Sequence, residues 1–318
     1  DGLHFSLGMD ISIGDGWVKI CSTTYIKGLC KRWLDGDVQD YDQVYTPADT
    51  HLLEFYETAL LTKGDGFNET EYRSLVGGLM WPAPTTRPDC LFCVGVLARA
   101  LTFPTFDLFK CAKRVLIFMG QTANDGILYS AAAHDASRLV AWSDSDWATR
   151  RSTTGSNVEL AGGSVLASSR RQDCTSSSSS HAEVIAASAT AFDLTWSRGL
   201  TGEMGLPQLS PTPLCVDAKN VITIVQNWLS SNKTRHIKRR DLVVREKEIE
   251  GLLEVTKVST HDNVADILTK ALDREPFVKL RRLLMQLIRV GVSFSMKLQP
   301  RRRARAQGEP EFSSVSGA

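Results

Sequence analysis

The chain has 318 residues, of which 42% are hydrophobic and 23% are charged, and its formal net charge is +1. This balance excludes a uniformly basic protein, so any affinity for nucleic acid must come from local patches. The length leaves room for two domains, each with its own core. We expect an intracellular protein, because no apolar run reaches the roughly 18 residues that span a membrane and the N-terminus shows no signal peptide.

The seven cysteines form an odd set spread through apolar segments. This pattern favours reduced thiols in the cytoplasm or nucleus over a disulfide framework. We interpret Cys90 and Cys93, a lone Cys-x-x-Cys pair, as buried thiols in a helix rather than as a zinc site. Residues 106–118 have helical spacing and predict a core helix, with template contact as the alternative. Its solvated face would carry Lys110, Lys113 and Arg114.

A buried strand is predicted over residues 139–146, where an apolar run ends in acidic residues. Asp144 would therefore lie near an edge of the sheet. Residues 155–160 and 164–168 predict two short strands around a glycine turn. The sheet should accordingly begin with antiparallel strands.

A long amphipathic helix is predicted after the serines at residues 176–180, with a hydroxyl group as its N-cap. Glu183 falls in the predicted first turn and off the centre of the apolar stripe, so its carboxylate can face either a metal or solvent. The residues of the stripe recur every three or four positions, at Ile185, Ala189, Phe192, Trp196 and Leu200.

Residues 212–217 predict a second apolar strand that ends in an aspartate. The β-branched segment 220–225 is compatible with a strand, but we predict a helix. Residues 252–258 alternate like a strand, and residues 264–270 predict a short helix with an acid near its N-terminus. Four acids could thus converge on one end of a mixed sheet, namely Asp144, Glu183, Asp217 and Asp266.

Two-metal hydrolysis of a phosphodiester requires such a set of clustered carboxylates. Their hard oxygen atoms suit two Mg²⁺ or Mn²⁺ ions. Because the carboxylates repel one another, we expect at least one raised pKa in the metal-free protein, and an activity that requires metal and rises with pH. The alternative is structural, since acids at strand ends and helix starts are common in a chain with 36 acidic residues.

A basic segment at residues 233–247 contains seven basic and two acidic side chains. It predicts phosphate contacts, with a solvated helix face as the alternative. The basic residues most concerned are Lys233, Arg235, Lys238, Arg239 and Arg240. His261 is a candidate proton shuttle near the metals, or else a polar loop side chain. The arginine-rich segment 301–305 predicts a disordered basic tail.

Six motifs resemble the ribonuclease H domain of copia-type LTR retrotransposon Pol polyproteins. They are Trp-Ser-Asp-Ser-Asp-Trp-Ala at 142–148, Arg-Ser-Thr-Thr-Gly at 151–155, Ser-His-Ala-Glu-Val-Ile-Ala at 180–186, Cys-Val-Asp at 215–217, Thr-Arg-His-Ile at 234–237 and Val-Ala-Asp-Ile-Leu-Thr-Lys at 264–270. The resemblance implies cleavage of the RNA strand of RNA:DNA hybrids, with selectivity from backbone shape and 2′-hydroxyl contacts. It also implies that the metals are bound by Asp144, Glu183, Asp217 and Asp266.

Three upstream segments, at residues 5–11, 72–80 and 85–89, resemble the region that follows the polymerase palm in the same polyproteins. They imply a partial thumb and connection. No Asp-Asp pair occurs in the chain, so the palm's metal motif is missing and DNA synthesis by this chain alone is not expected. The chain looks like a fragment of a longer polyprotein, whose palm, fingers and integrase would be its partners.

Some features depart from the family pattern. Residues 80–84 carry two prolines where the family has an apolar helix, and a proline inside a helix costs about 3 kcal/mol. The loop at 147–151 is short, and residues 238–240 are basic where the family tends to place an acid. These departures support an alternative, a catalytically inactive relic that at most binds nucleic acid. An integrase-like strand transferase is a weaker alternative, because that chemistry uses its acids in the order Asp, Asp, Glu.

We therefore predict an α/β protein with three parts. Residues 1–135 would form a mainly helical thumb and connection remnant, and residues 136–275 a ribonuclease H-like domain with a mixed five-stranded sheet and flanking helices. Residues 276–318 would form a basic, disordered extension. The predicted activity is that of a metal-dependent ribonuclease H that acts on RNA:DNA hybrids in cytoplasmic retrotransposon particles or in the nucleus, without a membrane partner.

Overall fold

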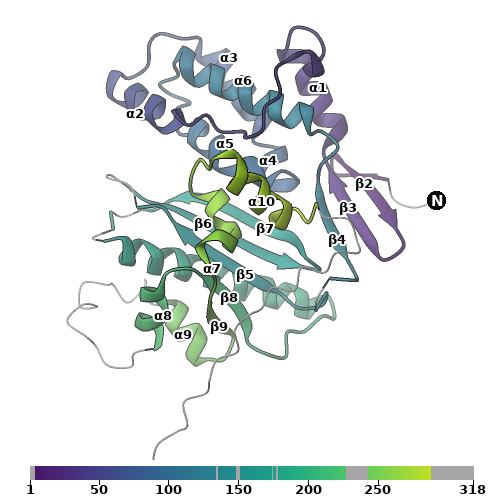
Figure 1. Ribbon diagram of the computed structural model, residues 1–318, viewed down its shortest axis with the longest axis vertical. Coiled ribbons are helices and arrows are strands. Elements are labelled where there is room, and N and C mark those ends of the chain that lie inside the picture. The colour runs from purple at the N-terminus through teal and green to yellow at the C-terminus, as the bar shows by residue number, and fades with distance from the viewer. Residues whose placement is uncertain are drawn as a thin grey trace, which may run out of the picture.

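Two β-sheets, one of four strands and one of five, organise the described part of the chain (Figure 1). The computed structural model describes residues 4–133, 135–147, 151–173, 175, 176, 178–226 and 243–287. Within these ranges, no helix combines the length and the apolar character needed to cross a lipid bilayer.

The N-terminal part is mainly helical, as predicted, but it also contains a small antiparallel sheet that was not predicted. The sheet has the order β1-β2-β3-β4, and β4 returns from beyond the helices to pair with β3. Its strands are β1 (Phe5–Ser6), β2 (Met9–Gly14), β3 (Trp17–Cys21) and β4 (Ile127–Ser130). The helices are α1 (Thr23–Trp33), α2 (Leu52–Thr62), α3 (Glu69–Leu79), α4 (Pro82–Thr85), α5 (Leu91–Ala98) and α6 (Phe106–Gln121), with 3-10 turns at Val38–Asp40 and Pro88–Cys90.

The helix predicted at residues 106–118 is α6. The hydroxyl of Thr105 caps its N-terminus by accepting a hydrogen bond from a backbone N–H of the first turn. Phe118 lies in a core that α6 shares with α1, α2, α3 and α5. On the outer face, exposed Lys110 forms an ion pair with Asp107, as predicted for a solvated face. Lys113 and Arg114 are only partly exposed, and Arg114 donates a hydrogen bond to the hydroxyl of Thr46.

The prolines of residues 80–84 do not interrupt a helix. Helix α3 has already ended at Leu79, and Pro82 is the first residue of α4. At this position the missing N–H group has no intrahelical hydrogen bond to lose. The expectation of a damaged helix is therefore wrong, and one reason for regarding the chain as a relic disappears with it.

The five-stranded sheet is mixed, as predicted. Three strands pair antiparallel: β5 (Val140–Ser145), β6 (Thr153–Leu160) and β7 (Gly163–Arg171). Two more run parallel to β5: β8 (Thr212–Val216), which pairs with β5, and β9 (Leu253–Lys257), which pairs with β8. The order across the sheet is β7-β6-β5-β8-β9, which places β5 at its centre.

Helices α7 (Ser179–Glu203), α8 (Lys219–Gln226) and α9 (Val243–Ile249) share a buried core with the five-stranded sheet. The helix predicted at 220–225 is confirmed by α8, but the apolar stripe predicted for α7 is wrong. Helix α7 buries small side chains such as Ala187 and Ala191, whereas Phe192 and Trp196 are 58% and 62% exposed. The reason is close packing, because alanine lets the helix backbone approach the strands and the large residues then face outward.

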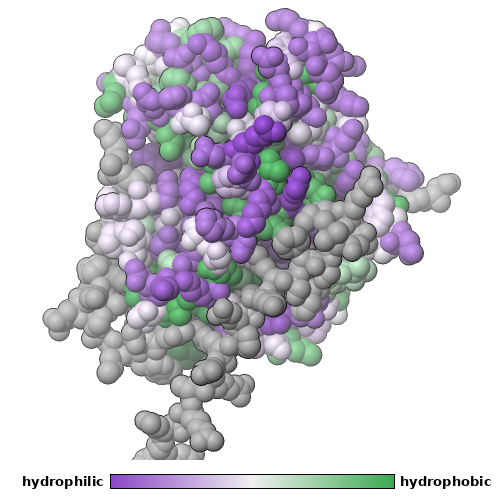
Figure 2. All heavy atoms as spheres, in the orientation of Figure 1, coloured by the Kyte–Doolittle hydropathy of each residue, from purple (hydrophilic) through white to green (hydrophobic). Residues whose placement is uncertain are grey.

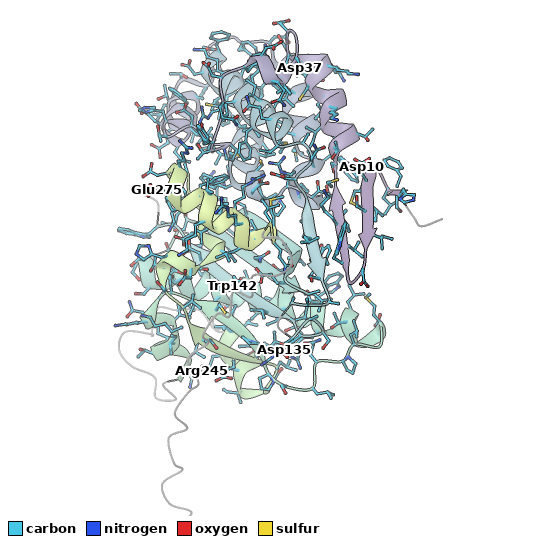
Figure 3. All side chains as sticks on the ribbon, turned by 45° about the vertical axis from the view of Figure 1, so that its right-hand side comes forward. Asp10, Asp37, Asp135, Trp142, Arg245 and Glu275 are labelled. Carbon is cyan, nitrogen blue, oxygen red and sulfur yellow. The ribbon has the colours of Figure 1, made fainter. Side chains whose placement is uncertain are left out.

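Residues 264–270 contain a 3-10 turn, η5 (Val264–Leu268), instead of the predicted short α-helix, with a further turn, η4 (Thr260–Asp262), before it. Helix α10 (Arg274–Leu284) follows, and its buried residues Phe277 and Leu284 belong to the N-terminal helical core. Hydrophilic side chains cover its outer face (Figure 2). Figure 3 shows α10, which carries Glu275, beside the sheet that contains Trp142.

The disordered extension predicted for residues 276–318 is thus wrong for its first residues. Residues 276–287 are ordered and packed, because α10 has an apolar face that fills the N-terminal core. The arginine-rich segment 301–305 lies outside the described residues.

Candidate metal centre

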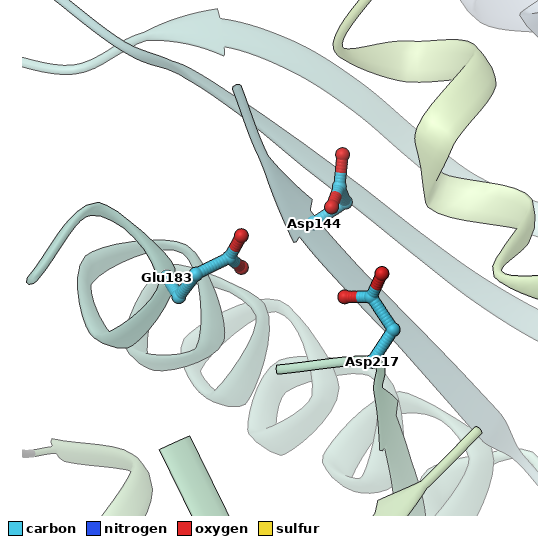
Figure 4. A group of neighbouring side chains, drawn as sticks. All are labelled: Asp144, Glu183 and Asp217. Atoms are coloured by element: carbon cyan, nitrogen blue, oxygen red, sulfur yellow. The ribbon is translucent and has the colours of Figure 1, made fainter. Parts of the chain in front are cut away.

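Three of the four predicted acids converge at the carboxyl ends of β5 and β8, two neighbouring inner strands of the five-stranded sheet. Each of Asp144, Glu183 and Asp217 offers one carboxylate oxygen, and these three atoms lie within 4.8 Å of one another. Figure 4 shows the three side chains turned toward one another. Asp144 is buried on β5, Asp217 directly follows β8, and Glu183 projects from α7. Hard carboxylate oxygens at this separation can hold a divalent cation such as Mg²⁺ or Mn²⁺.

Strand pairing explains why Asp144 and Asp217 meet. Strands β5 and β8 are parallel neighbours, and Trp142 pairs with Cys215. Each aspartate stands two residues beyond this pair, so both side chains point to the same face at the same end of the sheet. Two apolar strands that both end in acids predicted this arrangement.

Glu183 reaches the centre from the second turn of α7, not from the first turn as predicted. The helix begins at Ser179, and Ser178 is its N-cap, whose hydroxyl accepts a hydrogen bond from the backbone N–H of His181 at 3.2 Å. The hydroxyl N-cap itself was predicted. The error in the turn arose because any of several consecutive serines could have served as the cap.

The fourth acid, Asp266, lies beside the three-acid group but is not part of it. Its Oδ2 is 3.1 Å from the Nζ atom of Lys270, and the same ammonium group is 3.7 Å from Oδ2 of Asp144. The other oxygen of Asp266, Oδ1, is buried and has no hydrogen-bond partner. The structure therefore connects Asp266 to the group through Lys270 and Asp144.

The electrostatics of the centre agree with the expectation of raised carboxyl pKa values. Burial and the negative charges of Asp144 and Asp217 raise the pKa of Glu183 to about 9. Burial and the charge of Asp144 likewise raise the pKa of Asp266 to about 7. Both shifts mean that the site holds more negative charge than it can stabilise without a cation.

Two residues that were not singled out in the sequence hold Asp144 in place. The buried hydroxyl of Thr269 donates a hydrogen bond to Oδ2 of Asp144 at 2.5 Å. Gly155 pairs with Asp144 across β5 and β6, and a Cβ atom there would stand 2.7 Å from Cγ2 of Thr269 and 2.8 Å from the carbonyl oxygen of Ala265. A side chain at position 155 would push η5 away from β5. Both residues lie within motifs that the resemblance had identified, which is the signal that could have found them.

The other predicted site residues lie elsewhere. His261 is exposed in η4, and its carbonyl oxygen accepts a hydrogen bond from Lys279; it is not part of the three-acid group. Cys90 and Cys93 are buried, and the thiol of Cys93 donates a hydrogen bond to the carbonyl oxygen of Cys90, which agrees with buried thiols. Outside the described part of the chain lie the predicted phosphate contacts, Lys233, Arg235, Lys238, Arg239 and Arg240.

Curated proteins similar in sequence to this chain include polyproteins of plant transposons. The chain is 30% identical over 266 residues to the retrovirus-related Pol polyprotein from transposon TNT 1-94 of Nicotiana tabacum, which covers 81% of this chain and 19% of the relative. It is 30% identical over 280 residues to the corresponding polyprotein from transposon RE1 of Arabidopsis thaliana, covering 86% of this chain and 18% of the relative. An uncharacterized mitochondrial protein of Arabidopsis thaliana is 31% identical over 201 residues, covering 61% of this chain and 78% of the relative.

The chain thus spans about a fifth of the length of the curated Pol polyproteins that it matches. No protein-family model and no solved structure matches it. The identity to these polyproteins extends over most of the chain and agrees with the motifs that suggested the family. The chain belongs to the retrovirus-related Pol polyproteins of copia-type transposons.

Proposed function

We propose that this chain is a ribonuclease H, a metal-dependent endonuclease that hydrolyses the RNA strand of RNA:DNA hybrids during reverse transcription of a retrotransposon. The observation that carries the proposal is the convergence of Asp144, Glu183 and Asp217 at one end of the sheet, with Asp266 alongside. Three antiparallel strands followed by two parallel ones, with helices flanking them, are consistent with a ribonuclease H-like fold.

The residues at the centre fit a pair of Mg²⁺ or Mn²⁺ ions. All the donors are carboxylate oxygens, Oδ1 of Asp266 is buried without a partner, and the carboxyl pKa values of Glu183 and Asp266 are raised. Asp144, Glu183, Asp217 and Asp266 would hold the ions. When bound, the two ions would activate a water molecule and stabilise the leaving 3′ oxygen.

The chain's own residues contribute positioning and charge. Thr269 fixes one oxygen of Asp144, so this carboxylate presents the same atoms to every substrate. Glu183 must lose its proton before it can act as a ligand, and its position on a capped helix of 25 residues keeps it aimed at the two aspartates.

The proposed partner is an RNA:DNA hybrid, together with other segments of a Pol polyprotein. Hybrid selectivity would come from the shape of the backbone and from 2′-hydroxyl contacts, because the major groove of an A-like helix is too narrow for side chains to read. The basic side chains at residues 233–240 are proposed phosphate contacts. Cytoplasmic retrotransposon particles and the nucleus are the proposed locations.

A cleavage assay with matched variants tests the proposal. The purified chain should cut a labelled RNA:DNA hybrid with Mg²⁺ and leave duplex DNA and duplex RNA intact. Asp144→Asn and Glu183→Gln should abolish cutting. Glu203→Gln, at the exposed end of the same helix α7, should cut like the original chain. Equal cutting by Glu183→Gln and Glu203→Gln would refute the proposal, and no cutting by a folded chain would favour the inactive relic.

A further inference from the structure

Lys270 stands between two buried carboxylates of the centre. Its Nζ atom lies 3.1 Å from Oδ2 of Asp266 and 3.7 Å from Oδ2 of Asp144. The lysine side chain is 39% exposed, whereas those of Asp144 and Asp266 are 3% and 8% exposed. A single positive charge on a partly exposed side chain therefore balances two carboxylates that are themselves held in the interior.

The centre consequently has two unequal halves. The half formed by Asp144, Glu183 and Asp217 has ligand oxygens within 4.8 Å of one another, and no cation among the described residues is ion-paired to Glu183 or Asp217. The half between Asp144 and Asp266 is bridged by Lys270. Oδ1 of Asp266 has no hydrogen-bond partner although it is buried, so Lys270 leaves this half incompletely satisfied.

We propose that Lys270 is a displaceable internal cation, which holds the Asp144–Asp266 half of the centre in place of a second divalent ion until a substrate phosphate arrives. The inference rests on the proposed function and deepens it. The three-acid half would hold a first ion, because Glu183 and Asp217 have no ion pair among the described residues and only Asp144 is shared with Lys270. Asp144 and Asp266 would be free to hold a second ion only after the ammonium group of Lys270 has left them.

The side chain of lysine suits this role. Its ammonium group is a compact point charge on a flexible four-carbon stem, so it can turn away from the carboxylates without any movement of the backbone. The ammonium group of lysine is ordinarily charged at neutral pH, and here it faces two carboxylates, at 3.1 Å and 3.7 Å. A non-bridging oxygen of a bound phosphate gives the departing ammonium group a new partner and removes the cost of breaking its old contacts.

Counting bound Mn²⁺ ions in the full chain without nucleic acid tests the inference. Calorimetric titration should find one ion on the original chain and two on Lys270→Met. Any second ion on the original chain should bind at least about tenfold more weakly than the second ion on Lys270→Met. Electron paramagnetic resonance should show a coupled Mn²⁺ pair only in Lys270→Met. Lys270→Arg should return to one ion. Lys279→Met is the matched control, because Lys279 is also a half-exposed lysine paired with an aspartate, Asp262, and it should bind one ion.

The outcomes separate this inference from the proposed function. One ion on both the original chain and Lys270→Met, or two ions on both, would overturn the role of Lys270 and leave the metal centre intact. If Glu183→Gln removes no Mn²⁺ binding, the metal centre itself is overturned. If Lys270→Met fails to fold without metal, Lys270→Gln carries the same titration, because its amide keeps a hydrogen bond to the carboxylates without the charge.

Discussion

Arg281 should be one of the most important side chains for the stability of this protein. It lies on α10, and its Nε and one terminal nitrogen are each 2.7 Å from a carboxylate, Asp89 in the first case and Asp125 in the second. Asp89 is fully buried and is also bound by the buried Arg87. Burial alone would raise the pKa of Asp89, but the charges of Arg87 and Arg281 hold it at about 2.

The expected cost of Arg281→Met follows from these contacts. A hydrogen bond to a charged group contributes roughly 1.5–3 kcal/mol. The bond to Asp125 counts for less, because that carboxylate is 36% exposed. Asp89 keeps its two bonds from Arg87 and does not become an isolated buried charge. We therefore expect a loss of about 3 kcal/mol in the free energy of unfolding.

Equilibrium unfolding in urea, monitored on the full chain without metal, measures this loss. Arg282→Met is the control, because Arg282 is the exposed neighbour on the same helix. A loss below about 1 kcal/mol for Arg281→Met, or an equal loss for the two variants, would show that the buried network does not anchor α10.

Three other predictions concern the centre and the helix that carries Glu183. Gly155→Ala should destabilise the protein by about 1–3 kcal/mol and reduce cleavage, because the added Cβ meets Thr269 and a backbone carbonyl; unchanged urea unfolding would contradict this. The pKa of Glu183 is about 9 in the folded protein, above its ordinary value of 4.5. Between these two pH values the folded, metal-free protein binds one more proton than the unfolded chain, so its stability should fall as pH rises from the lower value to the higher. Melting temperatures across this pH range should show the fall, and Glu183→Gln should reduce it. Trp196→Ser, at an exposed position of α7, should change stability by less than about 0.5 kcal/mol, whereas Ala191→Leu should cost about 1–3 kcal/mol; the reverse order would mean that the other face of α7 is buried.

The end of the sheet that carries the acids could be predicted from the sequence, because each strand there is an apolar run followed by an aspartate. Apolar strands that end in aspartate mark both Asp144 and Asp217, and parallel pairing brings such ends together. The hairpin could also be predicted, because glycines mark its turn in the sequence. In the structure Ala161 and Gly162 adopt the two positive φ angles of that turn.

The features that were missed depend on contacts that periodicity does not encode. Large apolar residues every three or four positions usually mark the buried face of a helix, but the face that α7 packs on the sheet consists mostly of small side chains, with Val184 and Leu194 among them. Strands β1 to β4 are short, and β4 is remote in sequence from its partner β3. No local sequence pattern therefore predicts the four-stranded sheet. The location of Lys270 between Asp144 and Asp266 depends on the packing of η5 against β5, which has no local sequence signature.

The return of α10 to the N-terminal core has a consequence for biosynthesis. Phe277 meets Phe118 edge-to-face at 5.7 Å, and Met285 completes the same apolar cluster. During translation, α1 to α6 emerge before α10, so the apolar surface that they bury against α10 stays open until α10 has left the ribosome. A nascent chain paused between β4 and α10 would expose this apolar surface, and such exposed surface favours aggregation or binding by chaperones.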